Sequence, residues 1–178
     1  MTRRRVLLTS VLGIAIVALV TSLSGPLAVF AAAEDEEQAV LAKSLKEANV
    51  SLQQGLIASE REGQPISGKF EVEDGKLQLS VYTAKDGKFF EVIVDHKTGD
   101  IAKVEPIAGG EDLTHAKSQK AAIDRAKVKL VEATAKAKGQ VPDVLAVSAV
   151  PALKSDRPVA EVVLLTGSRF SKVSEPLD

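Results

Sequence analysis

The two histidines, His96 and His115, are the side chains best suited to bind a metal or transfer protons, because each has a carboxylate close by in the sequence. Asp95 precedes His96, and Asp112 lies one helical turn before His115. A shared metal site would require a turn and a helix start to converge, and neither segment has the paired spacing of a zinc motif. We therefore expect no metal, with both side chains in water. The alternative is an envelope protein that responds to a metal or a small molecule through these histidines and nearby acids.

The segment 95–100, Asp-His-Lys-Thr-Gly-Asp, places several oxygen atoms around Gly99, as a calcium loop does. It lacks the alternating acids and the closing glutamate of an EF-hand loop. A hairpin turn in which Gly99 adopts a positive φ explains the same residues without an ion. We expect that turn.

Motifs of the common catalytic sites are absent from the sequence. It contains no Gly-x-Ser-x-Gly elbow, no His-Glu-x-x-His and no phosphate-binding loop. It also contains no cysteine, which excludes a disulfide scaffold, a thiolate metal site, a cysteine nucleophile and a lipidated cysteine. No nucleophile can be paired with a base, so the sequence predicts no catalytic residues, no cofactor and no enzymatic activity.

Two helices and two groups of strands would position the remaining candidates. Apolar residues at helical spacing predict one helix over 36–60 and a second from an N-cap at Asp112 to about 138, before Gly139 and Pro142. Alternating apolar residues predict strands near 67–73, 76–83, 88–95, 100–105, 144–153, 159–166 and 170–173. The pairs Asp74-Gly75 and Asp86-Gly87 predict type I′ hairpin turns.

The second part of the chain repeats the first with an offset of about seventy residues. The segment 89–94 lines up with 159–164, and 102–107 resembles 171–177. We therefore expect an α+β fold that is a tandem repeat of a helix plus an antiparallel β-meander, with one unit at 34–107 and a degenerate unit at 108–178. The sequence leaves open whether the two sheets join edge to edge or pack through their helices.

The segment 77–107 resembles a PepSY domain, in which an aromatic-Glu-Val-x-Val-Asp strand is followed by Thr-Gly and a last strand. The residues that carry this resemblance are Tyr82, Gly87, Phe90, Glu91, Val92, Val94, Asp95, Thr98 and Gly99. The resemblance implies a small helix-plus-sheet fold that occurs in propeptides of thermolysin-like metallopeptidases and in short exported bacterial proteins, where it is proposed to bind or restrain peptidases. The tandem is also similar in outline to the β-lactamase inhibitor protein.

These features predict a non-catalytic binding module for a peptide or protein, with a peptidase among the classes of partner. The candidate binding residues are Tyr82, Phe89, Phe90, Glu91 and Asp95. Alternation places Phe89 and Phe90 on opposite faces of one strand, so we expect one of them in the core and the other, with Tyr82, on an exposed binding face.

Residues 1–33 have the pattern of a signal peptide: three arginines, an apolar stretch, and small residues before cleavage sites after Ala31 or Ala33. We expect export by the general route to the periplasm or the medium. A retained membrane anchor and twin-arginine export are the alternatives. Removal of the three arginines leaves 20 Lys+Arg against 24 Asp+Glu, so the mature chain is acidic and we expect no nucleic-acid partner.

Charge is also distributed unevenly between the two predicted helical regions. The range 34–63 has seven acids against three bases, whereas 112–140 has seven bases against three acids. This asymmetry favours docking of the two regions on each other or a surface of two charges for a partner, and two ordinary solvated helix faces would explain it equally well.

Overall fold

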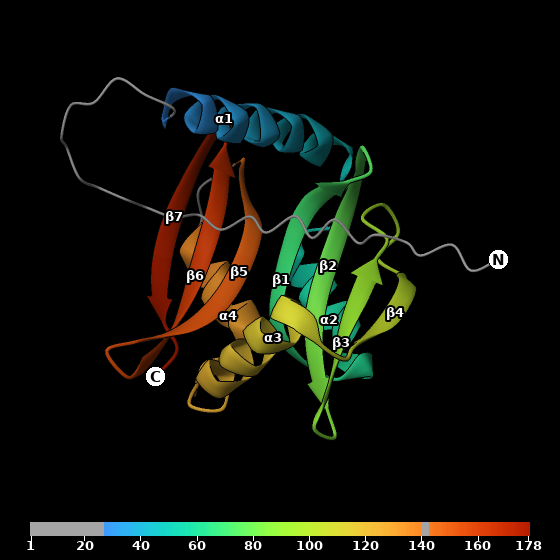
Figure 1. Ribbon diagram of the computed structural model, residues 1–178, viewed down its shortest axis with the longest axis vertical. Coiled ribbons are helices and arrows are strands. Elements are labelled where there is room, and N and C mark those ends of the chain that lie inside the picture. Colours follow the sequence, from blue (N-terminus) through green and yellow to red (C-terminus); the bar gives the residue numbers. More distant parts are fainter. Residues whose placement is uncertain (1–26, 140–142) are drawn as a thin grey trace.

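The computed structural model describes residues 27–139 and 143–178, in which helices pack on one seven-stranded antiparallel sheet (Figure 1). In chain order the elements are α1 (Leu27–Ser44), η1 (Leu45–Glu47), α2 (Leu52–Ser59), η2 (Glu60–Glu62), β1 (Gln64–Glu73), β2 (Lys76–Lys85), β3 (Lys88–Val94), β4 (Ile101–Ile107), α3 (Gly110–Ile123), α4 (Leu130–Lys138), β5 (Val144–Lys154), β6 (Arg157–Thr166) and β7 (Arg169–Pro176). The expected α+β class is confirmed. Within the two described ranges, no helix is long and apolar enough to cross a membrane.

The strands follow the order β4-β3-β2-β1-β5-β6-β7, so the two groups of strands join edge to edge through β1 and β5. This junction is short, with Gly68 opposite Ala149 and Lys69 opposite Ser148. A Cβ atom on Gly68 would lie 3.1 Å from the side chains of Leu52 and Leu56. The glycine therefore lets α2 pack closely on the sheet at the place where its two groups of strands meet.

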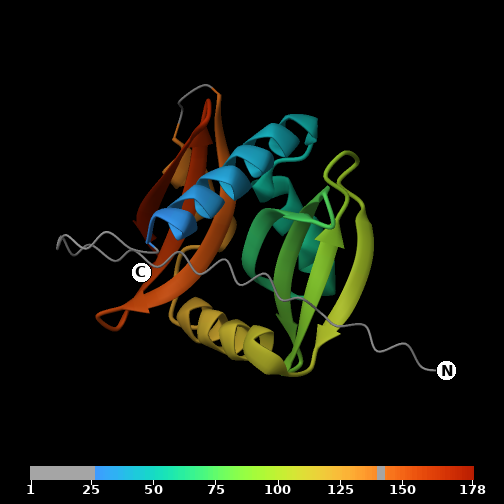
Figure 2. The same cartoon turned by 45° about the horizontal axis from the view of Figure 1, so that its top comes forward.

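The two faces of the sheet differ in how they are covered. Helices α2 and α4 lie behind the sheet in Figure 1, and α3 crosses in front of it. Helix α1 lies across the sheet at the opposite end of the strands from α3 (Figure 2). The hydrophobic core includes the layer behind the sheet, where Leu52 and Leu56 of α2 and Leu79 and Val81 of β2 are all buried. We call the face opposite α2 and α4 the front face.

Four two-residue hairpin turns fix the register of the strands, and in three of them both residues have positive φ. Both residues of Asp74–Gly75 and of Asp86–Gly87 have positive φ, between 50° and 73°. The type I′ turns expected there are thus confirmed, and the strands they connect pair without a shift across each turn. Ser155–Asp156 forms a third turn of this kind, with φ of 48° and 66°, without a glycine.

The prediction of two long helices is wrong. Residues 48–51 separate α1 and η1 from α2, and residues 124–129 separate α3 from α4. The first break is stabilised by a capping box at Ser51 and by the backbone N–H groups of Asn49 and Val50, which donate to the carbonyl of His96. In the second break, the N–H groups at 127 and 128 donate to the carbonyl of Leu177. The apolar stripe continues across each break, which is why spacing alone suggests one helix.

Two further expectations need correction. Helix α3 begins at Gly110 with Gly109 as its N-cap, so Asp112 is not the cap; its carboxylate bonds a tyrosine instead. The sequence alignment of 89–94 with 159–164 also matches β3 with β6, which occupy different positions relative to the junction. Counted outward from the junction, β6 corresponds to β2 and β7 to β3, and β4 has no counterpart among the described strands.

The expected signal peptide, 1–33, lies largely outside the described residues. Helix α1 begins at Leu27, so both expected cleavage positions fall within this helix.

Candidate functional site

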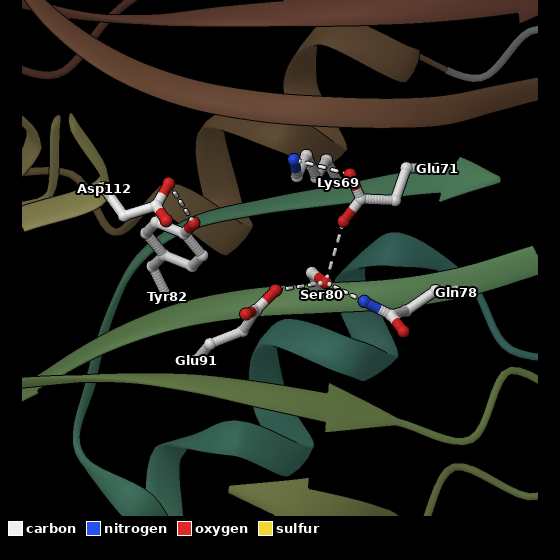
Figure 3. A network of polar contacts seen from close by, with 7 residues as sticks. All are labelled: Lys69, Glu71, Gln78, Ser80, Tyr82, Glu91 and Asp112. Carbon is white, nitrogen blue, oxygen red and sulfur yellow. Dashed lines mark hydrogen bonds and ion pairs between the residues drawn. The ribbon is translucent and has the colours of Figure 1, made fainter. Parts of the chain in front are cut away.

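A polar network on the front face of β1, β2 and β3 contains two of the five candidate binding residues (Figure 3). Its centre is Ser80, which is 1% exposed. The Ser80 hydroxyl lies 3.0 Å from Glu71 Oε1 and 2.8 Å from Glu91 Oε1, and Gln78 Nε2 donates to it at 2.9 Å. A hydroxyl has one proton, so Ser80 donates to one carboxylate at a time.

The strand register places these side chains together. Two-residue turns set Ser80 opposite Lys69 of β1 and opposite Ile93 of β3. Glu71 and Glu91 are then diagonal neighbours of Ser80 on the same face. Lys69 Nζ pairs with Glu71 Oε2 at 2.6 Å, whereas Glu91 has no ion pair with any described residue.

The two acids of the network therefore differ in their electrostatics. Burial raises the pKa of Glu91, and the nearby charge of Glu71 raises it further, while the Ser80 hydroxyl acts in the opposite direction. The Glu71 carboxylate has Lys69 as a partner. Lys69 also lowers the pKa of Glu91, but by less than burial raises it, and Glu91 is thus a half-buried acid that makes no ion pair with a described residue.

Tyr82 connects the front face to α3. Its hydroxyl donates to Asp112 Oδ1 at 3.0 Å, and Ser67 Oγ donates to Gln119 Oε1 at 2.8 Å two turns further along the helix. Burial raises the pKa of Tyr82, and the charges of Glu91 and Asp112 add to this effect. The phenol therefore stays neutral and remains a donor, and it fixes the start of α3 over the end of β2.

The aromatic candidates divide between the two faces. Phe89 lies opposite Ala84 on the front face, half-buried and packed with Tyr82 against the hydrophobic core. Phe90 alternates with the buried Val92 and so points to the α2 side, where it is also half-buried. Neither phenylalanine is fully buried, so the expectation that one of them would enter the core is wrong.

Asp95, the fifth candidate, lies apart from the network in the turn between β3 and β4. Its Oδ1 accepts the backbone N–H groups of Lys97 at 2.7 Å and Thr98 at 3.0 Å. These two donors lower the pKa of Asp95. Gly99 has φ of 83°, as expected for this turn. The contacts of Asp95 are those of a residue that shapes a turn.

The histidines do not join the network. The carbonyl of His96 accepts two backbone N–H groups, its Nδ1 is buried without a hydrogen bond to any described residue, and His115 is exposed on α3. Across residues 27–139 and 143–178 no three His, Cys, Asp or Glu side chains are grouped as metal ligands would be. Ser80 also makes no hydrogen bond to a histidine within these ranges.

A second cluster occupies the corresponding position in the other group of strands. Glu161 of β6 pairs with Lys154 of β5 and with Lys172 of β7. Here one carboxylate is held between two ammonium groups, whereas in the first network two carboxylates share one serine. The front face is therefore acidic on one side of the junction and basic on the other.

Sequence reasoning missed Glu71 and Ser80, and it assigned Asp112 to a helix N-cap and not to Tyr82. The first two could have been found, because the two-residue turns fix the register that brings them to Glu91. The contact between Tyr82 and Asp112 spans thirty residues and has no signal in the sequence.

No family model, curated protein or solved structure matches this chain.

Proposed function

We propose that this chain is an exported, non-catalytic binding module that engages a peptide or protein through the front face of its sheet. A peptidase is one class of partner, as the resemblance of residues 77–107 to PepSY domains suggests. The proposal of export is supported by the signal-peptide pattern of residues 1–33, and an exported chain would lie in the periplasm or outside the cell.

The observation that carries the proposal is the row of Tyr82, Phe89 and Glu91 on adjacent front-face positions. Tyr82 lies directly opposite Glu91, and Phe89 is the next front-face residue along β3. Both aromatic side chains are partly exposed, and such side chains supply contact area at little cost in conformational entropy and are enriched at protein interfaces. The acid beside them makes no ion pair with a described residue, so a basic side chain of a partner would stabilise its charge.

Affinity capture from an envelope extract of the native host tests the proposal. The Glu91→Lys variant places a like charge where a basic partner group would dock, so we expect it to lose the partner that the unchanged chain captures. Glu132→Lys makes the same charge change on an exposed position of α4, behind the sheet, and is the matched control.

The captured protein is then identified by mass spectrometry, purified and titrated against both variants. Capture of no protein at any salt concentration would contradict the proposal. Equal affinity of the purified partner for the Glu91→Lys and Glu132→Lys variants would show that the partner does not bind at the front face.

A further inference from the structure

The outer edge of β7 is the place in the sheet where another strand would fit. Counted outward from the junction, β7 corresponds to β3. The outer edge of β3 is covered by β4 at six paired positions from Phe89 to Val94, whereas no strand among the described residues pairs with the outer edge of β7. In the other group of strands, the corresponding edge is therefore covered by an antiparallel strand.

The register shows which backbone groups of β7 are available. Arg169 lies opposite Thr166 across the two-residue turn Gly167–Ser168, so this pair exchanges hydrogen bonds, and every second residue after it also faces β6. The N–H of Leu177 donates to the carbonyl of Pro158 at 2.9 Å, in agreement with this alternation. The N–H and C=O groups of the intervening residues therefore point away from β6; these residues are Phe170, Lys172 and Ser174.

The opposite edge of the sheet, formed by β4, has a proline that hinders the addition of a further strand, whereas β7 has none before its last residue. By the same alternation, Glu91 exchanges hydrogen bonds with Glu105, and the outward-facing positions of β4 include Pro106, which has no N–H to donate. Proline at such a position blocks the addition of a strand. In β7 the only proline is Pro176, at the end of the strand, so three outward N–H groups precede it.

The side chains along the β7 edge indicate what an added strand should carry. Phe170, Lys172 and Ser174 project on the front face. Lys172 shares Glu161 with Lys154, so this group of three residues has one positive charge in excess. Burial, and then repulsion by Lys154, lower the pKa of Lys172. An acid placed opposite Lys172 would supply the missing negative charge.

A second copy of this chain fits the edge poorly. Antiparallel pairing of two β7 strands that uses all three outward residues sets Lys172 opposite Lys172, and like charges in direct opposition are destabilising. Pairing of β7 with the β4 edge of another copy meets Pro106.

We propose that β7 accepts an extended acidic segment of a partner protein as an eighth, antiparallel strand, with an Asp or Glu opposite Lys172 and an apolar residue, two positions further along, opposite Phe170. Backbone hydrogen bonds would supply affinity and these two side chains the specificity. This inference rests on the proposed function in one respect, which is that the partner is a peptide or protein.

The strand β4 provides a probe with this pattern. In the sheet Glu105 lies opposite Glu91, and Ile107 lies opposite Phe89. A synthetic peptide of residues 101–107, acetylated and amidated, would place the same glutamate opposite Lys172 and the same isoleucine opposite Phe170. Its proline would face outward and prevent further strand addition. The matched control peptide has lysine in place of the glutamate.

Nuclear magnetic resonance titration and amide exchange of the full mature chain test the inference. We expect the glutamate peptide to protect the amides of Phe170, Lys172 and Ser174, and to bind about tenfold more tightly than the lysine peptide. Ser174→Pro removes one outward N–H and should abolish binding, whereas Val104→Pro, which removes an outward N–H on the β4 edge, should not change it.

Lys172→Glu keeps every backbone group and should reverse the preference between the two peptides, so the inference does not depend on the folding of a proline variant. Equal binding of both peptides, or protection confined to residues away from β7, would overturn it. If the chain captures its partner through the front face while Ser174→Pro has no effect on either ligand, the proposed function stands and the β7 inference falls. If β7 binds the peptide but no envelope protein is captured, the β7 inference stands and the proposed function falls.

Discussion

Substitution of Gly55 by alanine tests how tightly α2 packs behind the site. Gly55 lies in the middle of α2 and faces Leu79 of β2, which is fully buried. A Cβ atom on Gly55 would lie 2.5 Å from Leu79 Cδ2 and 3.1 Å from Leu79 Cγ. Leu79 stands between Gln78 and Ser80 in β2, so its displacement would reach the front-face network through the strand.

Two effects of opposite sign decide the result. Alanine in place of glycine inside a helix stabilises by about 1 kcal/mol. Insertion of a methyl group into a filled core costs about 1 to 3 kcal/mol. Because the atom in its path belongs to a fully buried side chain, we expect the second effect to prevail, with a net loss of about 1 kcal/mol in the free energy of unfolding.

Urea unfolding of four chains measures this loss: the unchanged chain, Gly55→Ala, Leu79→Ala and the double variant. Leu79→Ala alone should cost about 2 to 5 kcal/mol, and its cost should be smaller by about 1 kcal/mol when alanine occupies position 55. The exposed position Ser118 in α3 supplies the control, because the difference between its alanine and glycine variants gives the helix preference without a clash. A gain of stability in Gly55→Ala, together with additive costs in the double variant, would refute the reasoning.

Three further predictions concern single side chains. Tyr82→Phe removes the hydrogen bond to Asp112 and should lower the free energy of unfolding by about 1 kcal/mol, with faster amide exchange at the start of α3; unchanged exchange there would contradict the tether. Glu91 has a raised pKa in the folded chain, so its ionisation should reduce stability as the pH rises from the ordinary glutamate range through that pKa. Urea midpoints measured from about pH 4 to about pH 8 should show this decline in the unchanged chain and not in Glu91→Gln. Parallel plots of urea midpoint against pH for the two chains would refute the prediction. Asp95 has a lowered pKa, so it contributes stability above the ordinary aspartate pKa that is lost as the pH falls through its folded value; Asp95→Asn should be less stable than the unchanged chain at neutral pH, with a difference that disappears in acid, and a difference independent of pH would exclude the charge as the cause.

The sequence predicts the strands and turns well because their signals are local. A type I′ turn requires positive φ at two adjacent residues, and Asp-Gly is one of the few residue pairs that readily adopt it. Both Asp-Gly pairs form the expected turns. The helical regions are less predictable, because an apolar stripe has the same spacing in one long helix and in two short ones. The breaks depend on carbonyl groups of His96 and Leu177, which are far away along the chain.

The front-face network shows the same division. Tyr82 and Glu91 can be placed opposite each other from the register of one hairpin, as the structure has them. The approach of α3 to Tyr82 and the pairing of β1 with β5 depend on how segments far apart in the sequence pack. Periodicity contains no information on either, so the candidate residues can be predicted from the sequence but not the surface that they form.

Crosslinking in the native host tests the central claim most directly, because it reports export and partner binding together. Mild crosslinking of intact cells is followed by mass spectrometry of this chain from the soluble envelope and membrane fractions. We predict a soluble species that begins at Ala32 or Glu34 and is crosslinked to another protein through residues of the front face or of β7. A membrane-bound species that retains Arg3 to Arg5 and carries no crosslinked partner would contradict the account.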